Sequence, residues 1–117
     1  MYHNTLVADR RLLDDMARGS AEALRTLYRR HGNTVYALAY GIVVDPADAN
    51  EVVAETFLYA WEAAAGFVPT ARQSVCGWLC DIARSRAWGL QLARAWPERR
   101  GPTAEPNGPI MILEEVG

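Results

Sequence analysis

Apolar residues that recur every three or four positions constrain this chain more than any other feature of its sequence, because an α-helix brings such positions onto one face. The pattern holds in four segments, which are separated by residues that stop or start helices. Gly19 and Ser20 divide the first two segments, and Asp45-Pro46 pairs an N-cap acid with a proline at the first helical position. The sequence therefore predicts an all-α fold, a compact bundle of about four helices.

Each segment carries one apolar stripe that we expect to be buried. The predicted helices cover residues 6–18, a stretch after the N-cap Ser20, residues 46–65, and a stretch from the N-cap Ser74 to residue 96. The expected core residues are Leu6, Leu13, Met16, Leu24, Leu27, Tyr28, His31, Val35, Leu38, Ile42, Val53, Phe57, Ala60, Trp61, Ala64, Val75, Trp78, Leu79, Ile82, Leu90 and Ala93.

Two polar residues fall on these stripes. His31 fits a satisfied core or edge residue better than a ligand, because no neighbour in the sequence completes a metal site. Arg86 lies on the stripe of the last helix. Since an unpaired buried charge is costly, we expect Arg86 to reach solvent or to meet an acid such as Glu55.

A chain of 117 residues is long enough for one domain with a core of its own. We expect a helical domain over residues 1–96. Residues 97–117 are rich in proline and glycine, which indicates an irregular tail or a linker remnant. The tail ends in an apolar patch, Ile110 to Leu113, that is compatible both with docking on the domain or a partner and with a frayed end.

Composition and spacing disfavour several classes of function. No stretch has the ~20 apolar residues of a membrane helix, and the N-terminus lacks the apolar core of a signal peptide, so we expect a cytoplasmic protein without membrane insertion. Cys76 and Cys80 lie one helical turn apart, which favours packed, reduced thiols over a disulfide or a zinc site. No catalytic triad, metal cluster or glycine-rich phosphate loop occurs, so we expect no enzyme activity, no metal and no cofactor.

Charge is divided between two neighbouring segments. Residues 46–65 hold four acids and no basic residue, whereas residues 84–100 hold five arginines and a single acid. Opposite fields on one small domain favour two partners, one basic and one polyanionic. Phe67, in the loop between the segments, is suited to stack on a base. A solvated helix face is the simpler interpretation of the acids taken alone.

Three blocks of sequence resemble a family of bacterial transcription factors. Residues 48–61 read DANEVVAETFLYAW and resemble the second conserved region of sigma factors of the extracytoplasmic-function group, which typically reads DAEDVVQETFLxAW. Residues 77–87, GWLCDIARSRA, are similar to that family's AWLxxIARNxA, and residues 23–32, ALRTLYRRHG, are similar to its ALxxLYxRYG. The order and spacing of the blocks also fit, over about residues 8–96.

The resemblance implies a sigma region-2 bundle that takes part in transcription initiation. It implies binding of the clamp helices of core RNA polymerase by the third helix, through Asp48, Glu51, Ala54, Glu55, Leu58 and Tyr59. It also implies recognition of the promoter −10 element, mainly on the non-template strand, by the loop 67–73 and the fourth helix. The implied DNA-binding residues are Phe67, Thr70, Arg72, Arg84, Ser85, Trp88, Gln91 and Arg94. Arginine suits the phosphates, and a flipped base needs stacking and edge contacts.

The chain departs from the family pattern at positions that bear on both surfaces. Ala54 stands where the family usually has glutamine, Ser85 replaces its asparagine, and Val68 replaces the acid of its FDP motif. The family's fourth-region domain, which reads the −35 element, does not fit into the 21 residues after Trp96.

These departures keep a second interpretation open, a sigma-like interaction module or decoy. Such a protein binds polymerase, an anti-sigma factor or another partner without recognising a promoter. The chain is accordingly expected to be an excised domain, a short homologue whose partner supplies the fourth region, or a decoy of this kind.

Overall fold

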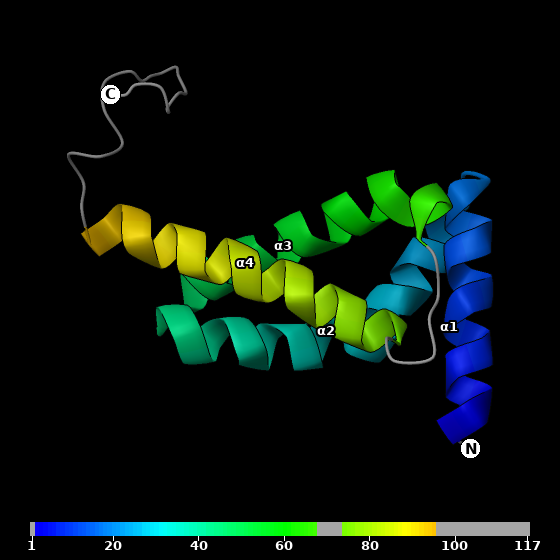
Figure 1. The fold of residues 1–117 in the computed structure, drawn as a ribbon, viewed down its shortest axis with the longest axis horizontal. Coiled ribbons are helices and arrows are strands. Elements are labelled where there is room, and N and C mark those ends of the chain that lie inside the picture. The colour runs from blue at the N-terminus through cyan, green and yellow to red at the C-terminus, as the bar shows by residue number, and fades with distance from the viewer. Residues whose placement is uncertain (1, 68–73, 96–117) are drawn as a thin grey trace. The chain divides into compact units, whose positions relative to one another are not determined.

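Four α-helices and one 3₁₀ turn make up the described part of the chain (Figure 1). The computed structural model describes residues 2–67 and 74–95, with side chains from residue 8 onward. α1 spans Tyr2–Ala17, α2 spans Ala21–Val43, α3 spans Pro46–Ala63 and α4 spans Val75–Ala95, and the 3₁₀ turn η1 is at Ala64–Gly66. The predicted all-α fold is confirmed.

Three side chains cap the helices where the sequence predicts. The Ser20 Oγ accepts a hydrogen bond at 3.1 Å from the backbone N–H three residues later, at the start of α2. The Asp45 Oδ1 accepts the equivalent bond at 3.1 Å at the start of α3, and the Ser74 Oγ accepts one at 3.0 Å at the start of α4. Each cap satisfies an amide that has no partner within its own helix.

The chain divides into two units, residues 1–87 and 88–117, and α4 runs through the boundary. Within the first unit, α2 and α3 form an antiparallel hairpin, and α1 runs across the end of that hairpin where α2 begins and α3 ends (Figure 1). Residues 44 and 45 connect the two helices of the hairpin. Val44 closes α2 in the left-handed conformation at φ 54°, and its N–H donates to the Tyr40 carbonyl at 2.8 Å.

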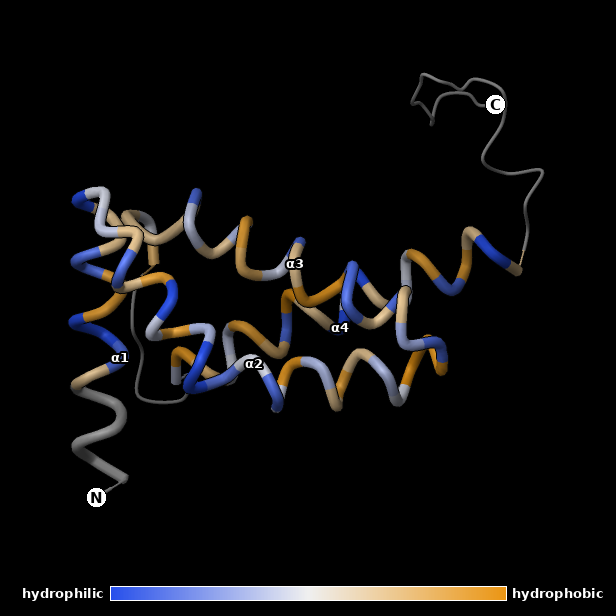
Figure 2. The backbone as a smooth tube through the Cα atoms, turned by 180° about the vertical axis from the view of Figure 1, so that it is seen from behind, coloured by the Kyte–Doolittle hydropathy of each residue, from blue (hydrophilic) through white to orange (hydrophobic). Residues whose placement is uncertain are grey.

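The core of the first unit is built from one stripe of each helix. Figure 2 shows the hydrophobic positions recurring between hydrophilic ones along α1, α2 and α3. The buried apolar residues of these helices include Leu13, Met16, Leu27, Val35, Ala39, Ala49, Val52, Phe57 and Ala60. Since these positions follow the 3.6-residue period, most of the stripes expected for the first three helices are confirmed.

The buried face of α4 differs from the expected one. Val75 and Leu79 are buried as expected, but Trp78 and Ile82 are only half-buried, and two alanines, at 83 and 87, are fully buried in their place. Alanine is among the residues most often fully buried, whereas tryptophan is large and rarely buried completely. The stripe is therefore turned toward the alanines.

Tyr28 is a second correction to the expected core. Its side chain is half-exposed, although its ring packs edge-on against Phe57 with centroids 5.2 Å apart. A tyrosine can cover a core residue with its ring while it keeps its hydroxyl in water. Tyr28 therefore forms the rim of the α2–α3 interface instead of its centre.

The described helices include none that is long and apolar enough to cross a membrane. The predicted tail at 97–117 lies outside the described residues, as does residue 96.

Candidate functional site

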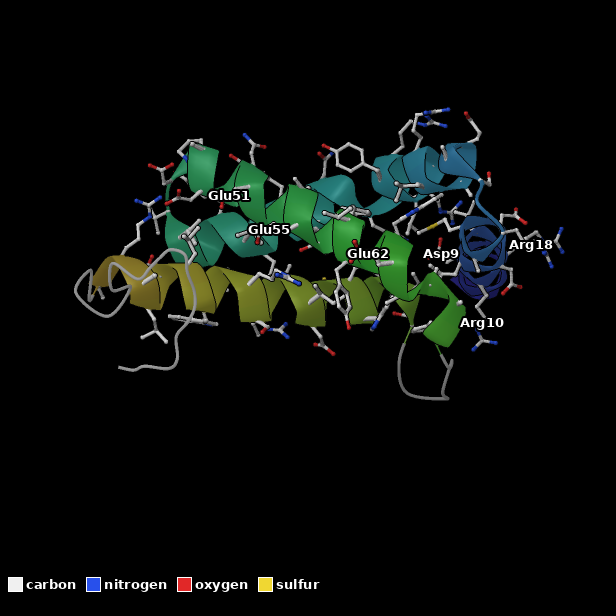
Figure 3. All side chains as sticks on the ribbon, turned by 90° about the horizontal axis from the view of Figure 1, so that it is seen from above. Asp9, Arg10, Arg18, Glu51, Glu55 and Glu62 are labelled. Atoms are coloured by element: carbon white, nitrogen blue, oxygen red, sulfur yellow. The ribbon has the colours of Figure 1, made fainter. Side chains whose placement is uncertain are left out.

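Three carboxylates line one side of α3. Glu51, Glu55 and Glu62 are four and seven residues apart, a spacing that places them on one helix face (Figure 3). Glu51 and Glu62 are exposed and Glu55 is half-buried. None of the three forms an ion pair with another residue that the structure describes. Their charge is therefore available to a basic partner.

Apolar side chains stand beside these carboxylates. Leu58 is 58% exposed and Tyr59 is 42% exposed, high values for residues of this size, and Ala54 is exposed as well. We call Glu51, Ala54, Glu55, Leu58, Tyr59 and Glu62 together the α3 outer face. A face that combines acids with exposed apolar groups can bind a partner by burial of apolar area as well as by charge.

Asp48 lies elsewhere, and the expectation that all four acids of this helix face solvent is wrong for it. Only 9% of Asp48 is exposed. It precedes the buried Val52 by four residues and so shares the side of α3 that faces the core. An acid in the first turn of a helix is stabilised by the helix dipole, which explains why the position tolerates a carboxylate.

Phe67, the residue that follows η1, packs its ring against Trp78 of α4. Their ring centroids are 4.8 Å apart at an interplanar angle of 48°. Phe67 is half-buried, so one side of its ring is occupied by Trp78. Thr70 and Arg72, which the sequence also assigned to DNA, lie outside the described residues.

The remaining candidate DNA-binding residues are all on α4. Arg84 and Ser85 are exposed and belong to the first unit, and Arg84 pairs with Asp81 at 2.9 Å. In the second unit Trp88 is 52% exposed, Arg94 is exposed and Gln91 is half-buried. A tryptophan side chain as exposed as that of Trp88 is unusual on a surface that binds nothing, and its indole is available for stacking.

Arg86 reaches solvent, which is one of the two outcomes expected for it. It is exposed, and its guanidinium carbon lies 5.6 Å from the centroid of the Tyr59 ring on α3. The alanine-centred burial of α4 explains this, because the buried stripe is rotated away from Arg86.

The two cysteines are free thiols, but both are half-buried, so the prediction that they are core residues is wrong. Burial, and to a smaller extent the neighbouring Cys80, raise the pKa of the Cys76 thiol to about 11. No group of three or more histidine, cysteine or acidic side chains in the described part of the chain is arranged to hold a metal ion.

Sequence reasoning missed a buried charge cluster between α1 and α2. Asp9, which is 1% exposed, places its Oδ2 2.7 Å from the His31 Nε2 and its Oδ1 2.9 Å from the Arg30 Nε. The Arg30 N–H does not point at Oδ1, which accepts no hydrogen bond within the described residues, so this contact is an ion pair only. His31 is thus a satisfied core residue, as expected.

Comparison with known proteins assigns the family. A family model described as Sigma-70 region 2 matches residues 27–89, more than half of the chain. The chain belongs to the Sigma-70 region 2 family. The matched residues contain all of α3 and most of α2. Sigma factors are not enzymes, in agreement with the expectation from the sequence.

The chain is also similar to a curated sigma factor. The chain is 33% identical over 76 residues to the ECF RNA polymerase sigma factor SigK of Mycolicibacterium vanbaalenii. The match covers 65% of this chain and 38% of that relative, so it spans well under half of the relative's length. It confirms the resemblance to region 2 of a sigma factor of the extracytoplasmic-function group. No solved structure matches the chain.

Proposed function

We propose that this chain is a transcription initiation domain that binds core RNA polymerase through the α3 outer face. The observation that carries the proposal is the row formed by Glu51, Glu55 and Glu62, which has no ion-pair partner among the described residues and lies beside exposed apolar side chains. A basic surface, such as that of the polymerase clamp helices, would complement both its charge and its shape.

The burial of each acid indicates whether it belongs to the centre or to the rim of the proposed interface. Glu51 and Glu62 are the exposed acids, and Glu55 lies between them next to Leu58 and Tyr59. Buried interface centres carry most of the binding energy, whereas rim charges mainly steer association. Glu55 therefore belongs to the centre of the proposed interface. Asp48 acts on the polymerase only indirectly, by supporting the first turn of α3.

The proposed promoter surface is on α4 and the loop before it. Arg84 offers a guanidinium to phosphate, since its pair with Asp81 is exposed and weak, and Trp88 offers an indole to an unstacked base. The proposed target is the non-template strand of the −10 element, bound in single-stranded form. A domain of this kind captures opened DNA and needs no catalytic group.

Ala54 supports the alternative function of a weak or non-initiating binder. It is exposed on the α3 outer face where the family pattern has glutamine. An alanine there offers a partner no side-chain hydrogen bond, so polymerase binding without promoter activity is the second candidate function.

Two binding experiments test the proposal. Co-purification with core polymerase tests the α3 outer face. Fluorescence anisotropy with labelled single strands tests the promoter surface, where one short sequence should bind best and its affinity should fall as salt rises. Polymerase binding without any strand preference would favour the decoy, and absence of both would refute the proposed function.

A further inference from the structure

A cation–π contact joins the helix proposed to face polymerase to the helix proposed to face DNA. The Arg86 guanidinium carbon on α4 lies 5.6 Å from the centroid of the Tyr59 ring on α3, and both residues belong to the unit of residues 1–87. A guanidinium within about 6 Å of a ring centroid is attracted by the electron density of the ring face. Arg86 forms no ion pair with another described residue, and its guanidinium contacts the Tyr59 ring instead.

The two residues of this contact stand at positions that the family pattern does not specify. Tyr59 occupies the open position of the DAEDVVQETFLxAW pattern, and Arg86 occupies the last of the three open positions of AWLxxIARNxA. Leu58 and Ala60 follow the pattern on either side of Tyr59, and Ala87 follows it after Arg86, whereas Ser85 departs from it. The pair is thus an addition at two positions that the family pattern leaves variable.

We propose that Arg86 is a positioning residue for polymerase binding, which holds the Tyr59 ring in place on the α3 outer face. This inference rests on the proposed function. Tyr59 follows Glu55 by four residues, so the orientation of its ring shapes the surface beside the central carboxylate. Through this contact α4 contributes to polymerase affinity without having to touch the polymerase itself.

Solvent exposure explains how the contact adds to affinity. Tyr59 is 42% exposed and Arg86 is exposed, so in the unbound protein water weakens their attraction. A partner that covers the ring removes this water and strengthens the attraction. Since a contact raises affinity only by the amount by which it is stronger in the bound state, the pair favours binding.

The positioning role and a simple charge effect predict opposite signs. Arg86 places a positive charge beside an acidic face, and by charge alone its removal would increase the attraction for a basic polymerase surface. If Arg86 positions Tyr59, its removal weakens binding instead. The sign of the change therefore separates the two roles.

A double-mutant cycle on the dissociation constant for core polymerase tests the inference. We expect Arg86→Gln to weaken binding about fivefold in the wild-type and Tyr59→Phe backgrounds, since phenylalanine keeps the ring. In the Tyr59→Leu background only the charge effect remains, so the same substitution should leave binding unchanged or slightly tighter. Arg86→Lys, which keeps the charge but loses the planar guanidinium, should show a smaller loss. The matched control is Arg25→Gln, which removes the same charge from an exposed arginine on α2 that pairs with Glu22 at 2.7 Å, and it should not weaken binding.

The outcomes distinguish this inference from the proposed function. Tighter or unchanged binding by Arg86→Gln, or an equal loss with and without the ring, overturns the positioning role while the proposed function stands. If the wild-type chain does not bind polymerase at all, both fall. Thermal unfolding of each variant identifies any that fail to fold, and Arg86→Lys then replaces Arg86→Gln in the cycle.

Discussion

The His31 Nε2 lies 2.7 Å from the Asp9 Oδ2, and this buried contact ties α1 to α2 across 22 positions of sequence. The positively charged Arg30 places its Nε 2.9 Å from the other carboxylate oxygen. The family pattern has tyrosine where this chain has His31. The contact between His31 and Asp9 therefore depends on a residue in which this chain departs from the pattern, and it holds α1 on the α2–α3 hairpin.

Removal of the Asp9 carboxylate should destabilise the fold strongly. Asp9→Ala leaves the buried His31 without its hydrogen-bond partner and removes the ion pair with Arg30, which should lower the free energy of unfolding by about 3 kcal/mol. Urea denaturation followed by circular dichroism measures the change. The matched control is Asp14→Ala on the exposed side of α1, which should change stability by less than about 0.5 kcal/mol. Equal effects of the two substitutions would show that the buried contact does not hold α1.

Val44 should be a site where glycine stabilises the protein. A β-branched residue at φ 54° is strained, and Val44 is 65% exposed, so its side chain contributes little burial. Val44→Gly should raise the free energy of unfolding by about 1 kcal/mol. Val44→Ala keeps a Cβ in the same conformation and should gain less. A lower urea midpoint for Val44→Gly than for wild type would contradict the strain.

The Cys76 thiol should make stability fall in alkaline solution. The pKa of Cys76 is raised from 9.0 to about 11, chiefly by burial. Between these values the unfolded chain loses the thiol proton while the folded chain keeps it, so the stabilising contribution is complete below pH 9 and is lost as the pH rises toward 11. Cys76→Ala should lose less stability over this interval than wild type. Parallel pH profiles for the two proteins would contradict the raised pKa.

Restoration of the family residue at Ala54 should strengthen polymerase binding. Ala54 is exposed on the α3 outer face, so Ala54→Gln adds hydrogen-bonding groups to the proposed interface without disturbing the core. One or two new hydrogen bonds correspond to about 1–2 kcal/mol, or a gain of roughly five- to thirtyfold in affinity. Surface plasmon resonance on immobilised core polymerase measures it. An unchanged affinity would place Ala54 outside the interface.

Two tryptophans of α4 should respond in opposite ways to alanine substitution. Trp88 is 52% exposed, so Trp88→Ala should weaken binding of the promoter strand by about 1–3 kcal/mol and leave the melting temperature nearly unchanged. Trp78 packs against Phe67, so Trp78→Ala should lower the melting temperature. If Trp88→Ala mainly lowers the melting temperature, its indole is a packing residue.

Local chemistry made the starts of α2, α3 and α4 predictable, whereas it did not reveal the start of α1 at Tyr2 or how the helices pack. Ser20, Asp45 and Ser74 cap helices because their side chains bond amides only three residues away. The buried face of α4 depends on how closely other helices approach, which the small residue Ala83 allows and hydropathy does not indicate. Asp9 and His31 are 22 positions apart and come into contact only when α1 packs on α2. No local sequence pattern therefore predicts their hydrogen bond.

In the candidate site, too, the features set by local sequence were predictable and those set by tertiary packing were not. Family motifs identified the α3 outer face, since Glu51, Glu55 and Leu58 are set by local helix spacing. The burial of Asp48 and the contact between Tyr59 and Arg86 arise from tertiary packing, and the sequence did not predict either in this form.

The affinity of the chain for core RNA polymerase, measured with wild type, Glu55→Arg and Asp14→Arg, tests the central claim most directly. Asp14→Arg makes the same charge reversal at an exposed position on α1, outside the α3 outer face. We predict tight binding by wild type and Asp14→Arg and a loss of at least about tenfold for Glu55→Arg, because a like charge then faces the basic partner. Equal affinities for wild type and Glu55→Arg, with both proteins folded by circular dichroism, would contradict polymerase binding through this face.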